Sequence, residues 1–441
     1  MKRRFLGQTV RFWLIAVAVF VVIQVIFVMG KRDIPVLGTI GGAFAQRVFL
    51  SAGVMAIVSL GLNLIYGFNG QFSLGQWGFY AIGAYTAADI TYRWNRGDST
   101  GLLFVVFAVV LLALFYGGIG RLIRRKLAFM DEMSRFTLYL VGTALAIAIS
   151  LGLTAALNGT ANAILGLLPE QVSMQLVFLI ATLAAGAVAA LISYLFGQPV
   201  LKLGGDYFGI ATLGLTMVVF VLANNADKVF PEMKGSRGMV GIPTITTWFW
   251  VFVFLLLALL IMRNLLDSSH GRAIISVRED EVAARAMGVD TTQYKTLAFV
   301  IGSFFAGIAG SLYAHQEGFL HPTTFNFIKS FDPLIIIVFG GLGSMTGTVV
   351  ASYAWALVLF YLLPSVLPQG GEGWRFVIYA LALLIIMLLR PQGLLGGREW
   401  GFLKPTHWPL RQGLLAENAS SGAKLSQPAE ALATGGSPEA E

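Results

Sequence analysis

The chain has 441 residues, of which 57% are hydrophobic and only 12% are charged, and its net charge is +8. A soluble protein of this length would need more charge to cover its surface, so the composition indicates a polytopic membrane protein. The absence of cysteine excludes disulfides and cysteine-ligated metals, and four scattered histidines disfavour a metal site. The positive charge is typical of basic cytoplasmic loops rather than of a nucleic-acid surface.

The N-terminus carries basic residues ahead of the apolar run 12–29. A cleaved signal peptide is the alternative, because Ala43-Phe44-Ala45 has the form of a cleavage tripeptide. The run is long enough to span a bilayer, however, and Lys31 and Arg32 intervene before that tripeptide. We therefore expect residues 1–47 to hold a first transmembrane helix, with its N-terminus in the cytoplasm, and an external loop.

Further apolar runs predict an all-α membrane protein with about 10–12 transmembrane helices and both termini in the cytoplasm. A shorter run, 333–343, predicts a half-helix or a re-entrant segment. The expected spans are 48–66, 75–92, 102–120, 137–157, 175–196, 208–226, 248–263, 297–314, 347–363 and 375–389.

The positions of the basic residues support this threading, that is, the assignment of each connection to the inside or the outside of the membrane. The connection 121–136 falls inside and is rich in Arg and Lys, whereas 158–174 falls outside and contains neither. The exception is 227–247, which comes out external despite three basic residues. We expect a permease domain over 48–396, with a cytoplasmic loop at 264–296. The polar composition of 412–441 predicts a disordered tail.

The chemistry of the chain narrows its function. No phosphate-binding loop for ATP occurs, because "GGLGSMTG" (340–347) has neither the Lys nor the spacing. The spans are nearly free of charge, which disfavours an ion-coupled carrier, and no catalytic constellation is visible. We therefore expect no catalytic or metal-binding residue, but a membrane pathway that other proteins drive.

The segment "SVREDEVAARAMGVDTTQYKTLAF" (276–299) interrupts this apolar chain with charge. Ser276 and Glu279 form a capping box that predicts a helix start, and Gly288 predicts the helix end. Asp290 and Gln293 form a second capping box, which begins the helix leading into the span 297–314.

The short helix between these signals has small apolar residues at helical spacing, and Glu281 and Arg285 are i, i+4 partners. Small side chains anchor poorly in lipid but allow another protein to approach closely. We therefore interpret the helix as a docking helix, with an interfacial helix on lipid headgroups as the alternative.

"EDEVAARAMGV" resembles the cytoplasmic coupling motif of ABC-importer permeases in the branched-chain amino-acid (LivM/LivH) family. Four further stretches resemble that family in the same order and cover most of residues 50–396. They are "LGLNLIYGFNGQFSLGQWGFYAIGAYTAA" (60–88), "LKLGGDYFGIATLG" (201–214), "GFLHPTTFNFIKSFDPLIIIVFGGLGSMTGTVV" (318–350) and "RPQGLLG" (390–396).

The resemblance implies a permease subunit in a bacterial cytoplasmic (inner) membrane, working by alternating access. Its implied partners are a homologous LivH-like permease, two ABC ATPase subunits and a periplasmic or lipid-anchored solute-binding protein. ATP and Mg would be used by the ATPases, and this chain would bind no cofactor. The residues implied in coupling to the ATPases are Glu279, Asp280, Glu281, Ala283, Ala284, Arg285 and Gly288.

The chain departs from the family pattern in two places. Residues 102–170 add about two spans, and "KGSRGMVGIP" (234–243) matches the family's external loop only loosely. These departures leave the solute open between branched-chain or related amino acids and urea, which permeases of the same superfamily carry. An autonomous channel or carrier is the rival class.

Two Gly-rich stretches predict the substrate pathway. Each is open to two interpretations: a discontinuous helix whose backbone lines the route, or a turn that allows tight helix packing. Asp206 has the position of a helix cap rather than of a substrate contact. The candidate pathway residues are Asn63, Gly67, Asn69, Gly70, Ser73, Gly75, Tyr207, Thr212, Gly340, Gly341 and Ser344.

Overall fold

The computed structural model describes residues 17–25, 27, 42–126, 132–166, 169–201 and 206–358, with 377, 381, 384, 385, 388, 393–395, 399, 400 and 403. Seven helices of this part are long and apolar enough to cross a membrane, which confirms the all-α polytopic fold. The tail 412–441, part of 12–29 and most of 375–389 lie outside the described residues. The total of about 10–12 spans and the location of the termini therefore stay predictions.

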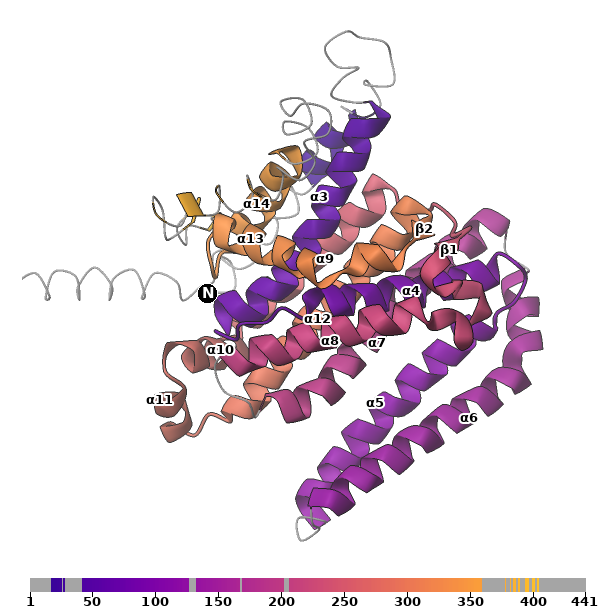
Figure 1. Cartoon of the computed structure of the whole chain (residues 1–441), viewed down its shortest axis with the longest axis horizontal. Coiled ribbons are helices and arrows are strands. Elements are labelled where there is room, and N and C mark those ends of the chain that lie inside the picture. Colours follow the sequence, from indigo (N-terminus) through magenta and orange to yellow (C-terminus); the bar gives the residue numbers. More distant parts are fainter. Residues whose placement is uncertain are drawn as a thin grey trace, which may run out of the picture.

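The helices follow the predicted spans in chain order (Figure 1). They are α3 (Ala43–Leu62), the π-helix η1 (Asn63–Phe68), α4 (Gln76–Trp94), α5 (Thr100–Lys126), α6 (Glu132–Gly166), α7 (Glu170–Val200), α8 (Asp206–Asn224), α9 (Trp248–Asp267), α10 (Ser269–Glu279), α11 (Glu281–Ala286), α12 (Thr291–Glu317), α13 (Phe331–Gly340) and α14 (Met345–Leu357). The short elements are η2 (Ala226–Lys228), η3 (Pro231–Met233), η4 (Gly235–Arg237), β1 (Met239–Val240), β2 (Phe319–Leu320), η5 (Pro322–Phe325) and η6 (Phe327–Ser330).

Helix α12 forms the centre of the bundle and packs against α3, α4 and α7. Glycines allow the helix backbones to touch: a Cβ at Gly302 would lie 2.6 Å from the carbonyl oxygen of Gly61. Gly83 and Gly307 meet in the same way between α4 and α12. Small residues at helix contacts are typical of membrane bundles, where close packing replaces the hydrophobic effect between helices.

The two ends of the bundle are distinct (Figure 1). Helices α10 and α11 lie at one end, whereas β1 and β2 lie at the opposite end. The strands form an antiparallel pair in which Met239 faces Leu320. The predicted cytoplasmic loop 264–296 and the basic stretch 227–247 thus lie at opposite ends, as the threading requires.

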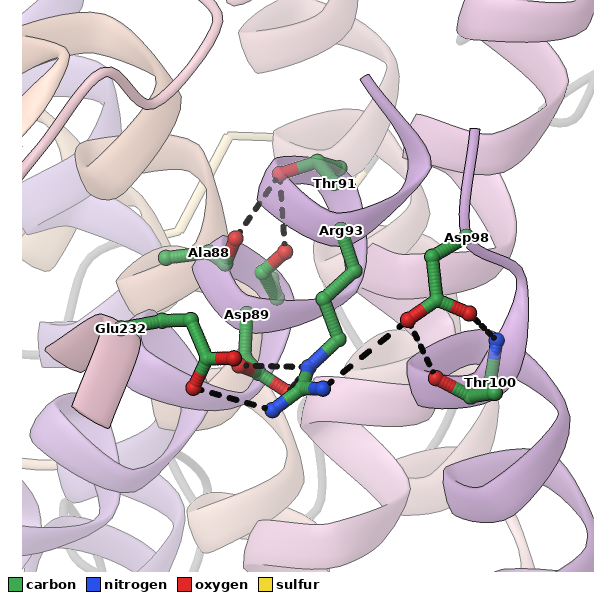
Figure 2. Close-up of polar contacts among 8 residues, drawn as sticks. Ala88, Asp89, Thr91, Arg93, Asp98, Thr100 and Glu232 are labelled. Carbon is green, nitrogen blue, oxygen red and sulfur yellow. Dashed lines mark hydrogen bonds and ion pairs between the residues drawn. The ribbon is translucent and has the colours of Figure 1, made fainter. Parts of the chain in front are cut away.

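The predicted insertion 102–170 coincides largely with two helices, α5 and α6, which pack on each other at one edge of the molecule (Figure 1). That these helices are an addition to the family stays a prediction. A charged cluster at the start of α5 holds this hairpin to the bundle. Figure 2 shows the guanidinium of Arg93 between the carboxylates of Asp89, Glu232 and Asp98, at 3.0, 3.3 and 4.0 Å. Asp98 also accepts a 2.9 Å hydrogen bond from the backbone N–H of Thr100, so the cluster joins α4, α5 and η3.

Helices α13 and α14 form a helical hairpin. With ten residues, α13 is about 15 Å long, half the thickness of a bilayer core. The chain turns at residues 341–344, and α14 packs back against both α13 and α3. A short helix is thus present where a half-helix or re-entrant segment was predicted, and its position in the bilayer stays a prediction.

Candidate pathway and coupling site

The first helix break lies between α3 and α4. The α-helix changes to a π-helix at Asn63, the helix ends after Phe68, and no helix resumes until Gln76. Gly70 has φ +78°, a conformation that disfavours any side chain. The predicted discontinuous helix is present, and it is also tightly packed, because Gly67 touches Asn63 and Gly343.

Asn63 joins this break to the second Gly-rich stretch. Its Nδ2 donates hydrogen bonds of 2.9 Å to the carbonyl oxygen of Ser344 and of 2.9 Å to Oγ1 of Thr348. Its Oδ1 accepts a 2.9 Å hydrogen bond from the backbone N–H of Gly343. The amide is completely buried and its donors and acceptor are engaged within the chain, so it braces the two breaks. We call residues 63–70 and 341–348 together the junction.

Other predicted pathway residues also have structural contacts. Thr212 is buried, and its Oγ1 accepts a 3.0 Å hydrogen bond from the backbone N–H of Leu74. Ser73 accepts a 3.3 Å hydrogen bond from the backbone N–H of Gly75. Tyr207 is 71% exposed on α8 and lies away from the junction's buried groups. The side chain of Asp206 lies outside the described residues, although α8 begins at that position.

The second break is closed by the C-terminal segment. Gly341 has φ +109°, and Ser344 caps α14 by accepting a 2.9 Å hydrogen bond from the N–H of Gly347. Gly340 ends α13 and contacts Gly347. The backbone N–H of Leu394, in the "RPQGLLG" stretch, donates a 2.8 Å hydrogen bond to the carbonyl of Phe339.

Glu399 adds a second C-terminal contact at the start of α14. Its carboxylate accepts hydrogen bonds of 2.5 Å from the N–H of Met345 and 3.1 Å from that of Thr346. Burial raises the pKa of the Glu399 carboxyl, and its hydrogen bonds to Thr346 oppose the shift. This cap was not predicted from the sequence, because 54 residues separate its partners.

The coupling segment differs from its prediction. It contains two helices, and the capping box at Ser276 is wrong: Ser276 lies in the last turn of α10, where its hydroxyl donates to the carbonyl of Ala273 at 2.8 Å. Asp280 is the cap instead, accepting hydrogen bonds of 2.8 and 3.0 Å from the N–H groups of Val282 and Ala283. A carboxylate that satisfies two N–H groups stabilises a helix start well, so the helix breaks at Asp280. Glu279 consequently ends α10 rather than lying in the first turn of α11.

The end of the segment agrees with its prediction. Gly288 has φ +83° and follows α11, and Asp290 caps α12 by accepting a 3.0 Å hydrogen bond from the N–H of Gln293. Glu281 forms the predicted ion pair with Arg285 at 3.1 Å. It also forms a 2.6 Å pair with Lys295, which holds α11 against α12.

The exposed face of α11 is larger and more apolar than the sequence suggested. Ala284 is only 5% exposed, so it packs inside the chain, whereas Ala283 is exposed. Val282 and Met287 are 80% and 84% exposed. These two side chains, absent from the predicted set, are the large apolar groups that α11 offers to a partner.

Arg278 connects the coupling segment to the junction. Its Nη1 donates a hydrogen bond to the carbonyl of Gly67, 211 residues away in the chain. A Cβ at Gly70 would lie 3.1 Å from Arg278 Cγ, and one at Gly343 would lie 3.1 Å from its Nη1. This residue was not predicted from the sequence, because a charge at a helix end gives no signal of a distant carbonyl partner.

No cluster of His, Cys, Asp or Glu able to hold a metal occurs within the described residues. The site is therefore built from backbone groups, neutral amides and hydroxyls, and a few paired charges.

Comparison with known proteins agrees with this arrangement. The family model described as "Branched-chain amino acid transport system / permease component" matches residues 44–388. The permease protein LivM of Escherichia coli is 27% identical over 88% of this chain and 76% of its own length. The LivM of Salmonella typhimurium is 27% identical over 78% of this chain and 68% of its own length. The LivH of Escherichia coli is 28% identical over 41% of this chain and 59% of its own length.

No solved structure matches the chain in this comparison. The family match, by contrast, contains both breaks, the α13–α14 hairpin and the predicted coupling segment. The predicted resemblance is thereby confirmed: the chain belongs to the permease components of branched-chain amino-acid transport systems.

Proposed function

We propose that the chain is one permease subunit of an ATP-driven importer for branched-chain or related aliphatic amino acids. The observation that carries the proposal is the hydrogen bond from Arg278 to Gly67. It connects the end of α10, which is followed directly by the exposed helix α11, to the break after α3, so a force on α11 can move the break through α10. Alternating access would follow from tilting the bundle around this contact.

The proposed partners are a homologous LivH-like permease, two ATPase subunits and a periplasmic or lipid-anchored solute-binding protein. The ATPases would dock on α11, where Val282 and Met287 offer flexible apolar contacts beside the charges of Asp280 and Arg285. They would use ATP and Mg, and this chain would bind neither. The bacterial inner membrane is the proposed location.

A neutral amino acid suits the groups around the junction. The predicted route offers backbone carbonyls and N–H groups, hydroxyls and apolar side chains, which bind a zwitterion weakly enough to release it. The relatives are named as branched-chain amino-acid permeases, which favours this solute class over urea.

Reconstitution tests the proposal. Proteoliposomes with the chain, its partner permease, the ATPases and the binding protein should accumulate leucine only with ATP, and excess urea should not compete. Liposomes with the chain alone should show no flux above empty vesicles. Appreciable leucine flux through the chain alone, or ATP-driven uptake of urea instead of leucine, would contradict the proposal.

A further inference from the structure

A C-terminal segment bridges the second helix break. The backbone N–H groups of Leu394 and Leu395 donate to the carbonyls of Phe339 and Gly340, at 2.8 and 3.4 Å. These carbonyls lie at the end of α13, where a helix has no acceptor-satisfying N–H of its own. We call the described residues of this segment, 393–395, 399, 400 and 403, the strap.

The strap also holds the start of α14. The carboxylate of Glu399 accepts hydrogen bonds from the N–H groups of Met345 and Thr346 and from the Thr346 hydroxyl. The N–H of Trp400 donates to the same hydroxyl at 3.1 Å. The first N–H groups of a helix have no acceptor within that helix, so the strap satisfies free backbone groups on both sides of the turn 341–344. Any change in the angle between α13 and α14 would therefore break one of these two sets of bonds.

The contact of Glu399 has only two stable states. This residue is 7% exposed. Burial raises the pKa of its carboxyl, and hydrogen bonds from residues 344–346 oppose the rise, with no Lys or Arg of the described chain among the causes. A carboxylate is tolerated in such a place only while these donors and the positive end of a helix surround it. If α14 moved away, Glu399 would leave for water, so the strap is either fastened or released.

The rest of the strap is attached lightly. Leu403 is completely buried, but Leu394 and Trp400 are 37% and 46% exposed. Segments with few buried apolar contacts are those that open at the lowest cost in free energy. The amide of Asn63, by contrast, holds the same turn from a completely buried position on the bundle. The strap is therefore the part of these contacts that can detach while the bundle stays folded.

We infer that the strap is a latch on the α13–α14 hairpin, fastened by Glu399 in this structure and released when α11 is driven in the transport cycle. Arg278 provides the route, because a Cβ at Gly343 would lie 3.1 Å from its Nη1. Gly343 lies two residues before Met345, whose N–H binds Glu399. A displacement of α10 thus acts on the tip of the hairpin beside the latch. The inference rests on the proposed function, since ATP-driven motion of α11 supplies the force.

Hydrogen exchange in the complete, unaltered transporter in lipid nanodiscs tests the release. Peptides that contain Met345 and Leu394 should exchange about tenfold faster or more while ATP is hydrolysed in the presence of leucine than without nucleotide. A peptide that contains Gly302 and Gly307, where α12 is tightly packed, should exchange equally under both conditions. Strap exchange that ATP leaves unchanged overturns the inference, because the latch then stays fastened throughout the cycle.

Glu399→Gln tests what fastens the strap, in the purified full-length chain alone in nanodiscs. The substitution keeps the shape of the side chain but removes its charge, and hydrogen bonds to a neutral acceptor are weaker. The Met345 and Leu394 peptides should therefore exchange about tenfold faster or more than in the unaltered chain. Glu317→Gln is the matched control: its carboxylate pairs with the exposed Arg47 at 3.4 Å, and the variant should leave the strap unchanged.

The outcomes also separate the latch from the proposed function. Equal strap exchange in Glu399→Gln and the unaltered chain overturns the latch without reference to transport. Faster exchange of the α12 peptide in Glu399→Gln overturns it too, because Glu399 would then support the whole fold. Loss of ATP-driven leucine uptake by the complete, unaltered transporter contradicts the proposed function instead.

Discussion

At the scale of single residues, Asn63 is the side chain on which most of the junction depends. Replacing it by Leu keeps the volume but leaves the N–H of Gly343 without the 2.9 Å acceptor it now has. An unsatisfied buried donor costs about 1–3 kcal/mol, so we expect a clear fall in the thermal unfolding midpoint in detergent. Leucine uptake should fall with it, since the breaks would separate.

Ser59 provides the control, one turn earlier on α3. Its hydroxyl is completely buried and has no hydrogen-bond partner among the described residues. Ser59→Ala should therefore be neutral or slightly stabilising. If Ser59→Ala lowers the unfolding midpoint as much as Asn63→Leu does, this part of the helix is sensitive to any substitution. The result would contradict the inference that the Asn63 amide holds the two breaks together.

The sequence identified Asn63, Gly67 and Gly70 as a cluster but not their contacts. Glycine and amide residues in an apolar run indicate a break, and the break is present. The partners of Asn63 are 280 to 285 residues away, and no local pattern indicates them. A buried amide that bonds within the chain and one without a partner among the described residues, as in Asn69, look alike in a sequence.

At the scale of elements, the coupling segment shows where local signals compete. Ser276 and Asp280 both have the residue type and position of a helix cap, and the carboxylate at 280 accepts two N–H groups. One helix was predicted, and α10 and α11 formed instead. The long apolar spans were predicted correctly, because burial in lipid over about 20 residues leaves few alternatives to a helix.

The contact between α11 and α12 should depend on pH. The hydrogen bond from Lys295 is the largest cause that lowers the pKa of Glu281 below its ordinary 4.5. Because the pKa of Glu281 is lowered while α11 lies against α12, the charged carboxylate stabilises this contact at pH values above its ordinary pKa. The stabilisation is lost as the pH falls through the lowered pKa. We expect a spin label at Val282→Cys to become more mobile below about pH 4.5.

The cysteine-free chain makes this label unique. Glu281→Gln in the same labelled chain should be mobile at every pH, because the neutral amide removes the ion pair. A label whose mobility follows the same pH curve in both chains would show that another group holds α11.

At the scale of the whole molecule, four segments distant in sequence meet at the junction. The break after α3, the tip of the α13–α14 hairpin, the C-terminal residues Leu394 and Glu399 and the end of α10 are joined by hydrogen bonds. The end of the bundle with β1 and β2 lies at a distance from them (Figure 1). Motion applied at α11 would therefore reach both broken helices through one set of polar contacts.

Arg278 is the point where this coupling can be cut. In the reconstituted transporter, Arg278→Ala should lower leucine uptake about tenfold or more, because a hydrogen bond from a charged group is lost. ATP hydrolysis should change far less, since α11 keeps its own cap and ion pairs. Arg278→Lys should restore part of the uptake, because an ammonium can donate to the Gly67 carbonyl without the reach of the guanidinium.

Arg272 on the same helix gives the matched control. It is exposed, and its guanidinium donates to the carbonyl of Asp267, at 3.5 Å, rather than to the junction. Arg272→Ala removes the same charge from α10 but no contact with the junction, so uptake per ATP hydrolysed should stay the same. Arg272→Ala and Arg278→Ala could instead lower the uptake per ATP hydrolysed equally. The positive charge of α10 would then determine coupling and the hydrogen bond to Gly67 would not, so the coupling route would run through another contact, such as that of α10 with α12.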